Sequence, residues 1–95
     1  MHVVKNRLVH IGIGGPPLLN VELLQKALDP AGAWLRYHAH GWVLHSSEPL
    51  HQIRDRIRSI PALANANILI SEFTLGTADG MLPEWAWNWM RERSV

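Results

Sequence analysis

Histidine is the residue type whose number and spacing most suggest chemistry, with six copies in 95 residues. His38 and His40 are two positions apart and can share one face of a strand, and His45 is expected to face them across a hairpin. Because Zn²⁺ accepts imidazole ligands, these three residues form a candidate open zinc site. The turn between them can break the strand geometry, and no carboxylate is adjacent. The alternative is a set of partly exposed polar side chains near a hairpin tip.

Four arginines form a candidate basic surface for a nucleic acid: Arg36, Arg54, Arg56 and Arg58. A spacing of two on a helix turns the last three guanidinium groups in different directions, so they make no single stripe. Asp55 offsets part of this charge and can pair with Arg58 at i,i+3. Nine basic and eight acidic residues give a net charge of +1, which creates no strong field toward nucleic acids or membranes. A solvated helix face is the favoured interpretation.

Carboxylates and glycines give weaker signals. Asp29, Asp55 and Asp79 are expected at a helix end, on an exposed face and in a loop, and no nucleophilic catalytic set can be assigned. Residues 12–15 (GIGG) precede a helix, as in loops that bind phosphate. Pro17 occupies the place of the third glycine of a dinucleotide-binding motif, so we expect a tight connection instead.

Composition predicts one domain over residues 1–95 and a cytoplasmic protein. The sequence has no cysteine, which removes disulfides and thiolate catalysis and fits a reducing compartment. No stretch approaches the ~20 apolar residues of a membrane span, and the N-terminus does not resemble a signal peptide. We expect neither a membrane association nor a cofactor.

Apolar periodicity and turn signals predict the order β-α-β-β-α-β, followed by a last helix. The strands are expected over 8–13, 33–38, 42–46 and 67–73, the last largely buried, and the helices over 18–28, from an N-cap at Ser47 to Ile60, and over 83–93. Prolines at 30 and 61 end the first two helices. This order is typical of an α+β, ferredoxin-like fold: an antiparallel sheet with both main helices on one face, plus an additional C-terminal helix.

Three tryptophans alternate with other residues in the last helix. Helical geometry places Trp85, Trp89 and Met90 in an apolar arc of about 140°, together with two smaller residues, and Trp87 about 60° beyond its edge. We expect the arc to cover the sheet. Trp87 either caps the margin of that contact or touches a second protomer.

The tail also resembles a known family. Residues 80–83 (GMLP) and 86–90 (AWNWM) resemble the G-W-L-P…A-W-D-W-L ending of the small SinR-like proteins. Residues 34–37 (WLRY) with 42–44 (WVL) resemble that family's W-x-x-Y-L-x-S-x-W-L-V hairpin, and residues 53–57 (IRDRI) resemble its I-R-D-R-L helix. The family is related to the VapD-like toxins and the CRISPR adaptation nucleases. The resemblance therefore implies a ferredoxin-like fold, homodimers and contact with nucleic acid.

The nuclease relatives carry an aspartate near the end of the first strand, where it holds a divalent metal. Residues 10–14 (HIGIG) have no carboxylate, and Mg²⁺ prefers oxygen ligands. We therefore expect a homodimeric, non-catalytic interaction module associated with nucleic acid. The alternative is a small metal-dependent ribonuclease or toxin that uses His10 or the group of His38, His40 and His45.

Overall fold

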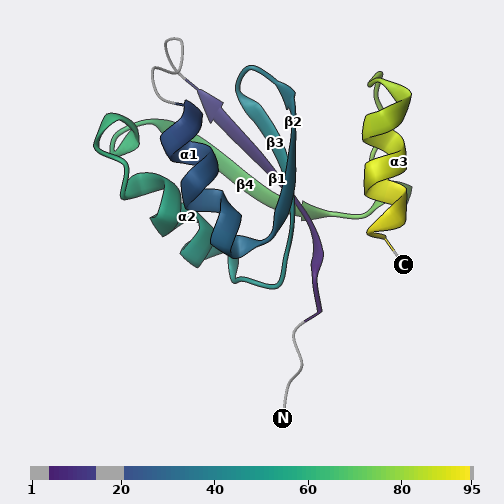
Figure 1. Cartoon of the computed structure of the whole chain (residues 1–95), viewed down its shortest axis with the longest axis horizontal. Helices are drawn as coiled ribbons and strands as arrows, with labels where there is room; N and C mark the ends of the chain where they lie inside the picture. The colour runs from purple at the N-terminus through teal and green to yellow at the C-terminus, as the bar shows by residue number, and fades with distance from the viewer. Residues whose placement is uncertain (1–4, 15–20, 95) are drawn as a thin grey trace.

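The computed structural model describes residues 5–14 and 21–94 of the chain (Figure 1). The strands are β1 (Arg7–Gly14), β2 (Ala33–His38), β3 (Gly41–Ser46) and β4 (Asn67–Phe73), and the helices are α1 (Val21–Leu28), α2 (Leu50–Arg58) and α3 (Glu84–Glu92). The predicted α+β class is confirmed, and each predicted strand end lies within one residue of the observed one. The predicted helical residues 18–20 and the loop residues 15–17 lie outside the described residues.

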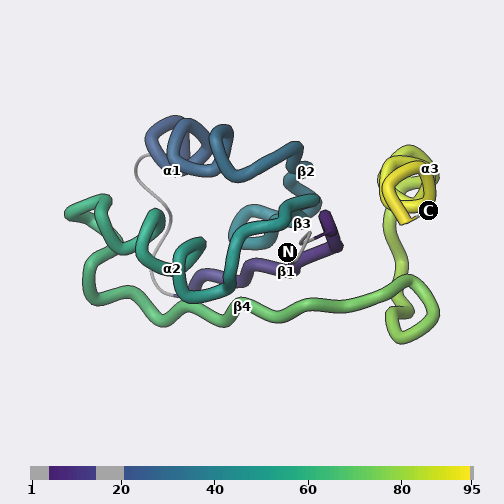
Figure 2. The backbone as a smooth tube through the Cα atoms, turned by 90° about the horizontal axis from the view of Figure 1, so that it is seen from below, coloured from purple at the N-terminus to yellow at the C-terminus, as the bar shows by residue number. Residues whose placement is uncertain are grey.

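The four strands form one antiparallel sheet in the order β2-β3-β1-β4. β1 and β3 are central, whereas β2 and β4 lie at the two edges. Helices α1 and α2 cover one face, and α3 stands on the other side at the end of an extended segment that follows β4 (Figures 1 and 2). The sheet is therefore the middle of three layers.

The larger hydrophobic core lies between the sheet and the first two helices. On β1, the side chains of Val9, Ile11 and Ile13 point into this core because alternate residues of a strand share a face. Trp42 of β3 is fully buried there, and Ile53 and Ile57 of α2 close the other side. This alternation within β1 explains why its sequence predicts a strand.

A second, smaller core lies between the sheet and α3. Leu8, Leu35 and Val43 come from three strands, and Ala86 and Met90 come from the helix. Where α3 packs on the sheet, both faces of the central strands β1 and β3 are thus covered. Consecutive apolar residues in β1 and β3 follow from that double burial.

Three local predictions are wrong. The N-cap of α2 is Pro49 instead of Ser47, and the Oγ of Ser46 accepts a hydrogen bond from the backbone N–H of Glu48 at 3.0 Å. The helix ends at Arg58, two residues before Ile60, whose extended backbone conformation is the one favoured before proline. Strand β4 is only half buried, because it occupies an edge of the sheet.

No helix in the described part of the chain is long and apolar enough to cross a membrane.

Candidate functional site

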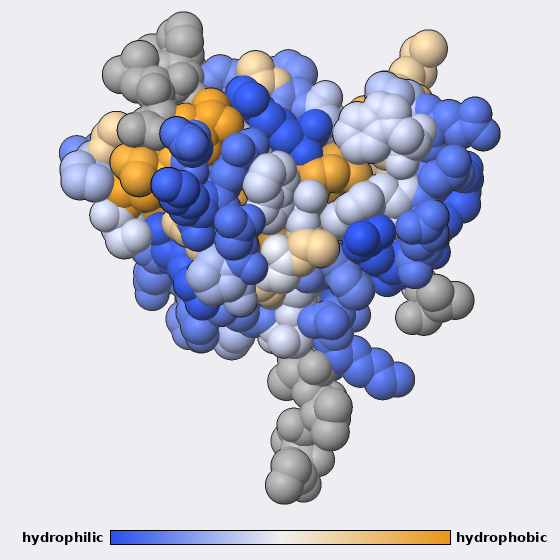
Figure 3. All heavy atoms as spheres, in the orientation of Figure 1, coloured by the Kyte–Doolittle hydropathy of each residue, from blue (hydrophilic) through white to orange (hydrophobic). Residues whose placement is uncertain are grey.

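A pocket of about 360 Å³ lies between the sheet and the C-terminal part of the chain. Its walls come from all four strands, from the loop before α3 and from α3 itself; the lining residues are His10, Tyr37, Val43, Ser71, Phe73, Ala78, Asp79, Gly80, Met81, Leu82, Trp87 and Met90. Figure 3 shows apolar, orange residues in the region between the sheet layer and α3, bordered by blue, hydrophilic ones. The volume is in the range of sites for small molecules.

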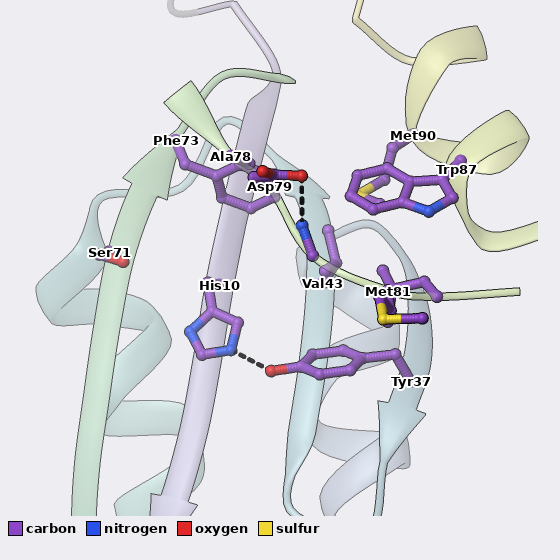
Figure 4. Close-up of a pocket in the computed structure, with 12 residues that line it drawn as sticks. His10, Tyr37, Val43, Ser71, Phe73, Ala78, Asp79, Met81, Trp87 and Met90 are labelled. Carbon is purple, nitrogen blue, oxygen red and sulfur yellow. Dashed lines mark hydrogen bonds between the residues drawn. The ribbon is translucent and has the colours of Figure 1, made fainter. Parts of the chain in front are cut away.

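His10 and Tyr37 form the polar centre of this pocket. The sheet register places His10 between Val43 of β3 and Ser71 of β4, and all three line the pocket. The Nε2 atom of His10 lies 2.6 Å from the hydroxyl oxygen of Tyr37, a hydrogen bond whose donor depends on the imidazole tautomer (Figure 4). Burial lowers the pKa of His10 below its usual value of 6.5. Burial therefore favours the neutral form of this imidazole.

The absence of a side chain at Gly41 leaves the space that the Tyr37 ring occupies. A Cβ atom on Gly41 would lie 2.6 Å from Cζ of Tyr37, far closer than two carbons can approach. The register shift between Arg36 and His38 puts Tyr37 in an irregular part of the β2–β3 pair, next to this glycine. The β2–β3 hairpin thus places the Tyr37 hydroxyl within hydrogen-bond distance of His10 on β1.

Trp87 and Asp79 border the opposite side of the pocket (Figure 4). Trp87 is half buried and packs against the second core. Asp79 lies in the exposed loop before α3, where its Oδ1 accepts a hydrogen bond from the N–H of Gly80 at 2.8 Å. The pocket therefore combines aromatic and thioether walls with one carboxylate and one hydrogen-bonded His–Tyr pair.

The lowered pKa of His10 predicts that the protein loses stability as the pH falls below about 6.5. In that range the unfolded chain binds a proton on this histidine before the folded chain does. The contribution is fully present above pH 6.5 and decreases until the pH reaches the folded-state pKa. Urea denaturation between pH 7.5 and 5, followed by far-UV circular dichroism, measures this change.

Replacing the imidazole provides the control for this pH dependence. His10→Gln should reduce the slope of unfolding free energy against pH. His45, whose pKa is also lowered by burial and by the charge of Arg93, supplies a further part of the slope. In the double variant with His10→Gln and His45→Gln, the free energy of unfolding should therefore depend less on pH than in either single variant. A wild-type profile with no slope in this range, or an unchanged slope in His10→Gln, would contradict the prediction.

The three histidines of the predicted zinc site do not converge. His38 pairs with Gly41 at the hairpin tip, whereas His45 pairs with Ala33 and Leu8 at the other end of β3. The expectation that His45 faces the other two across the hairpin is therefore wrong. His38 and His40 do lie together, with ring centroids 6.4 Å apart and the His40 N–H donating to Nδ1 of His38. Within residues 5–14 and 21–94, no group of three or more His, Asp or Glu side chains could hold a metal ion.

Three of the four arginines of the predicted basic surface have local partners. Arg36 donates to the carbonyl of Ala39 and lies over the ring of Trp42, so it is held on the hairpin. On α2, Arg56 makes a two-pronged ion pair with Glu48, whose pKa is lowered mainly by these hydrogen bonds.

The remaining two arginines of this set lie on the exposed side of α2. Arg54 pairs with Asp55, where Arg58 was the expected partner, and Arg58 is itself exposed. Two of the three arginines on this helix therefore have a carboxylate beside them, which supports the interpretation of a solvated helix face.

One of the tail tryptophans, Trp85, lies differently from the prediction. Trp85 is 56 % exposed, whereas Trp87 packs against the second core together with Trp89 and Met90. Ala86 and Met90 are the most buried residues of α3, so the helix is rotated about its axis toward Trp87 relative to the predicted arc. Trp87 is half buried at the margin of this contact, as one of the two predicted alternatives has it, whereas the expectation that Trp85 covers the sheet is wrong.

Sequence reasoning missed Tyr37 and Asp79 as members of a common site with His10. No local pattern marks them, because the pocket joins residues from four strands and a loop near the C-terminus. The one usable signal is the glycine at position 41, opposite the end of β2, where a large neighbouring ring needs space.

The fold and the pocket define a small three-layer α+β domain with an open, partly aromatic cavity. Comparisons of the chain with protein-family models, with curated proteins and with solved structures found no match.

Proposed function

We propose that this chain is a non-catalytic interaction module that works as a homodimer and has the ferredoxin-like fold. The strand order β2-β3-β1-β4, antiparallel throughout, with α1 and α2 on the same face, supports this fold assignment. We place the chain near the SinR-like group on the pattern of residues 80–90, and in the cytoplasm because the sequence lacks cysteine.

The observation that carries the dimer is the outer edge of β4. Among the described strands, β4 pairs only with β1, so one row of its backbone N–H and C=O groups faces outward. It pairs in continuous register over Asn67–Phe73 and contains neither proline nor lysine, the usual devices that protect an edge. Leu69 on this strand is 68 % exposed. Such an edge is suited to pairing with another strand.

The other edge strand is less suited to this role. β2 has a register irregularity between Arg36 and His38, which twists an edge away from a partner. β4 is in addition compatible with a second copy of itself, because an antiparallel pair centred on Ile70 keeps the two Glu72 carboxylates from lying directly opposite each other. With a two-fold axis through the middle of β4, the outward backbone groups of both chains would form the same set of hydrogen bonds.

A charge on the exposed face of β4 tests this dimer. We expect light scattering at high micromolar concentration to give twice the 10.8 kDa chain mass for the wild type. Leu69→Lys should shift the protein toward the monomer, because two lysines close to the two-fold axis would repel each other. Its side chain is exposed, so the change should leave the circular dichroism spectrum unaltered.

Trp85→Lys is the matched comparison, since it places the same charge on another large exposed apolar residue, outside β4. We expect this variant to remain dimeric. If it becomes monomeric while Leu69→Lys does not, the dimer interface lies on α3. A wild-type mass of one chain at every concentration would overturn the dimer.

Association with nucleic acid is the second part of the proposal. It receives its support from Arg58 on the exposed side of α2 and from Arg54, whose ion pair with Asp55 is exposed, since Arg56 and Arg36 are held by less exposed local partners. Fluorescence polarisation with single-stranded RNA should show binding that weakens as salt rises. Arg54→Ala with Arg58→Ala should abolish it. Binding unaffected by both changes would remove α2 as the contact.

One observation favours a different function, a small ribonuclease. His10 is a half-buried imidazole with a pKa lowered by burial, and it lies within hydrogen-bond distance of a tyrosine hydroxyl. Side chains of these two types take part in general acid–base catalysis. Purified protein should be incubated with RNA and a panel of divalent metals. Cleavage that disappears in His10→Ala would replace the non-catalytic proposal with the enzymatic one.

A further inference from the structure

We propose that the pocket between the sheet and α3 binds a small aromatic amine in its cationic form. Ser71 and Phe73 of β4 line this pocket with their side chains, whereas the proposed dimer uses the outward backbone groups of that strand, so the two proposals are tested separately. The argument rests on the shape of the pocket, on its apolar walls and on the sign of its charge.

The walls favour a flat ring. Phe73 and Val43 line the pocket from the sheet, and Trp87, Leu82 and Met90 line it from the tail. Figure 4 shows the Trp87 indole and the Met90 thioether on one side of the open space and His10 on the other. Aromatic rings stack on indole faces and make favourable contacts with thioether sulfur. The volume of about 360 Å³ accommodates one or two fused rings with a short side chain.

The charge of the lining favours a cation. The twelve lining residues include neither lysine nor arginine, and burial lowers the pKa of His10, which disfavours its cationic form. Asp79 is the one carboxylate among them. An anionic ligand would therefore meet a negative group with no compensating cation, whereas an ammonium group would be attracted. The indole of Trp87 adds to this preference, because the face of an indole attracts cations.

The Asp79 carboxylate has capacity for such a group. Its Oδ1 accepts one hydrogen bond, from the adjacent Gly80 N–H. A carboxylate offers about four lone-pair sites, so further donors can be accepted. The loop places it at the exposed side of the pocket, across from the His10–Tyr37 pair (Figure 4). A ligand with a ring at the walls and an ammonium group toward solvent satisfies both features.

Two probes of matched shape and opposite charge test the proposal. Phenethylamine and 3-phenylpropionate share a phenyl ring and a two-carbon chain, and differ in carrying an ammonium or a carboxylate. Titration of the full chain should be followed in ¹H–¹⁵N correlation spectra, with the Trp87 indole signal assigned from Trp87→Phe. We expect saturable shifts of that signal with phenethylamine, with a Kd on the order of 1 mM.

The carboxylate probe should bind at least about fivefold more weakly, and the preference should decline at high salt. Asp79→Asn should bring the two affinities together. Glu84→Gln, which removes a carboxylate outside the lining, should leave the ratio unchanged. Since the spectra also report folding, a variant that fails to fold is recognised directly.

Three results would overturn the proposal: no saturable shift with either probe, equal affinity of the wild type for both, or a preference that survives in Asp79→Asn. The dimer measured by light scattering is independent of each of these outcomes.

Discussion

Replacing Trp42 with alanine is expected to lower the free energy of unfolding by about 3–5 kcal/mol. Trp42 is the largest fully buried side chain, and it lies in the larger core opposite Ile11 of β1. Truncation removes the apolar contacts of the indole and leaves a cavity that β1 and α2 can fill only in part. For a domain of this size, such a loss is a large share of the total stability. Urea denaturation followed by circular dichroism measures it.

Trp42→Phe separates packing from polarity. The Nε1 atom of Trp42 is buried and has no hydrogen-bond partner among the described residues. Phenylalanine retains most of the ring and removes that N–H, so the loss should be below about 1.5 kcal/mol. If both variants lost the same amount, ring volume would not be the main contribution of this residue.

Gly32→Ala should be the most damaging of the conservative changes, with a loss of about 3 kcal/mol or more. Gly32 has a φ of 150°, a conformation that residues with a side chain rarely adopt. A Cβ atom there would lie 2.0 Å from the carbonyl oxygen of His45, which is fixed in the sheet. The strand β2 would have to shift relative to β3 to make room. The midpoint of thermal or urea unfolding measures the effect.

Gly76→Ala is the matched control for backbone freedom. Its φ is not positive, and the nearest atom to an added Cβ is Oγ1 of Thr74 at 4.0 Å. The change should be neutral or should stabilise by about 0.4–1 kcal/mol, since alanine restricts the unfolded chain. An equal loss at positions 76 and 32 would mean that the clash with His45 does not determine the effect.

The sequence predicts the elements well where local signals decide them. The bounds of β2 and β4 follow from β-forming residues between turn signals, and the end of α1 at Leu28 follows from the proline at position 30. The order of the strands in the sheet is not a local property. The burial of β4 was therefore overestimated, because an apolar run such as Ile68–Ile70 looks the same at an edge and in the centre.

The candidate site was harder to predict, for two physical reasons. The face of α3 that meets the sheet depends on where the preceding loop places the helix, so amphipathicity alone misplaced Trp85. The β2–β3 register shift brings Tyr37 over Gly41, and such irregularities have no clear sequence signal. His10 was identified as a candidate, but not its partner.

Because α3 packs only on the far face of the sheet, it can detach without disturbing α1 and α2. Its helix contributes only to the smaller core, whereas the larger core is closed by α1 and α2. Detachment of α3 would expose Leu8, Leu35 and Val43 and leave the larger core covered. The amide hydrogens of α3 are thus expected to exchange with solvent through a local opening. Those of β1 are expected to exchange only when the whole domain unfolds. A ligand in the pocket, which touches both layers, would slow the first of these exchange processes.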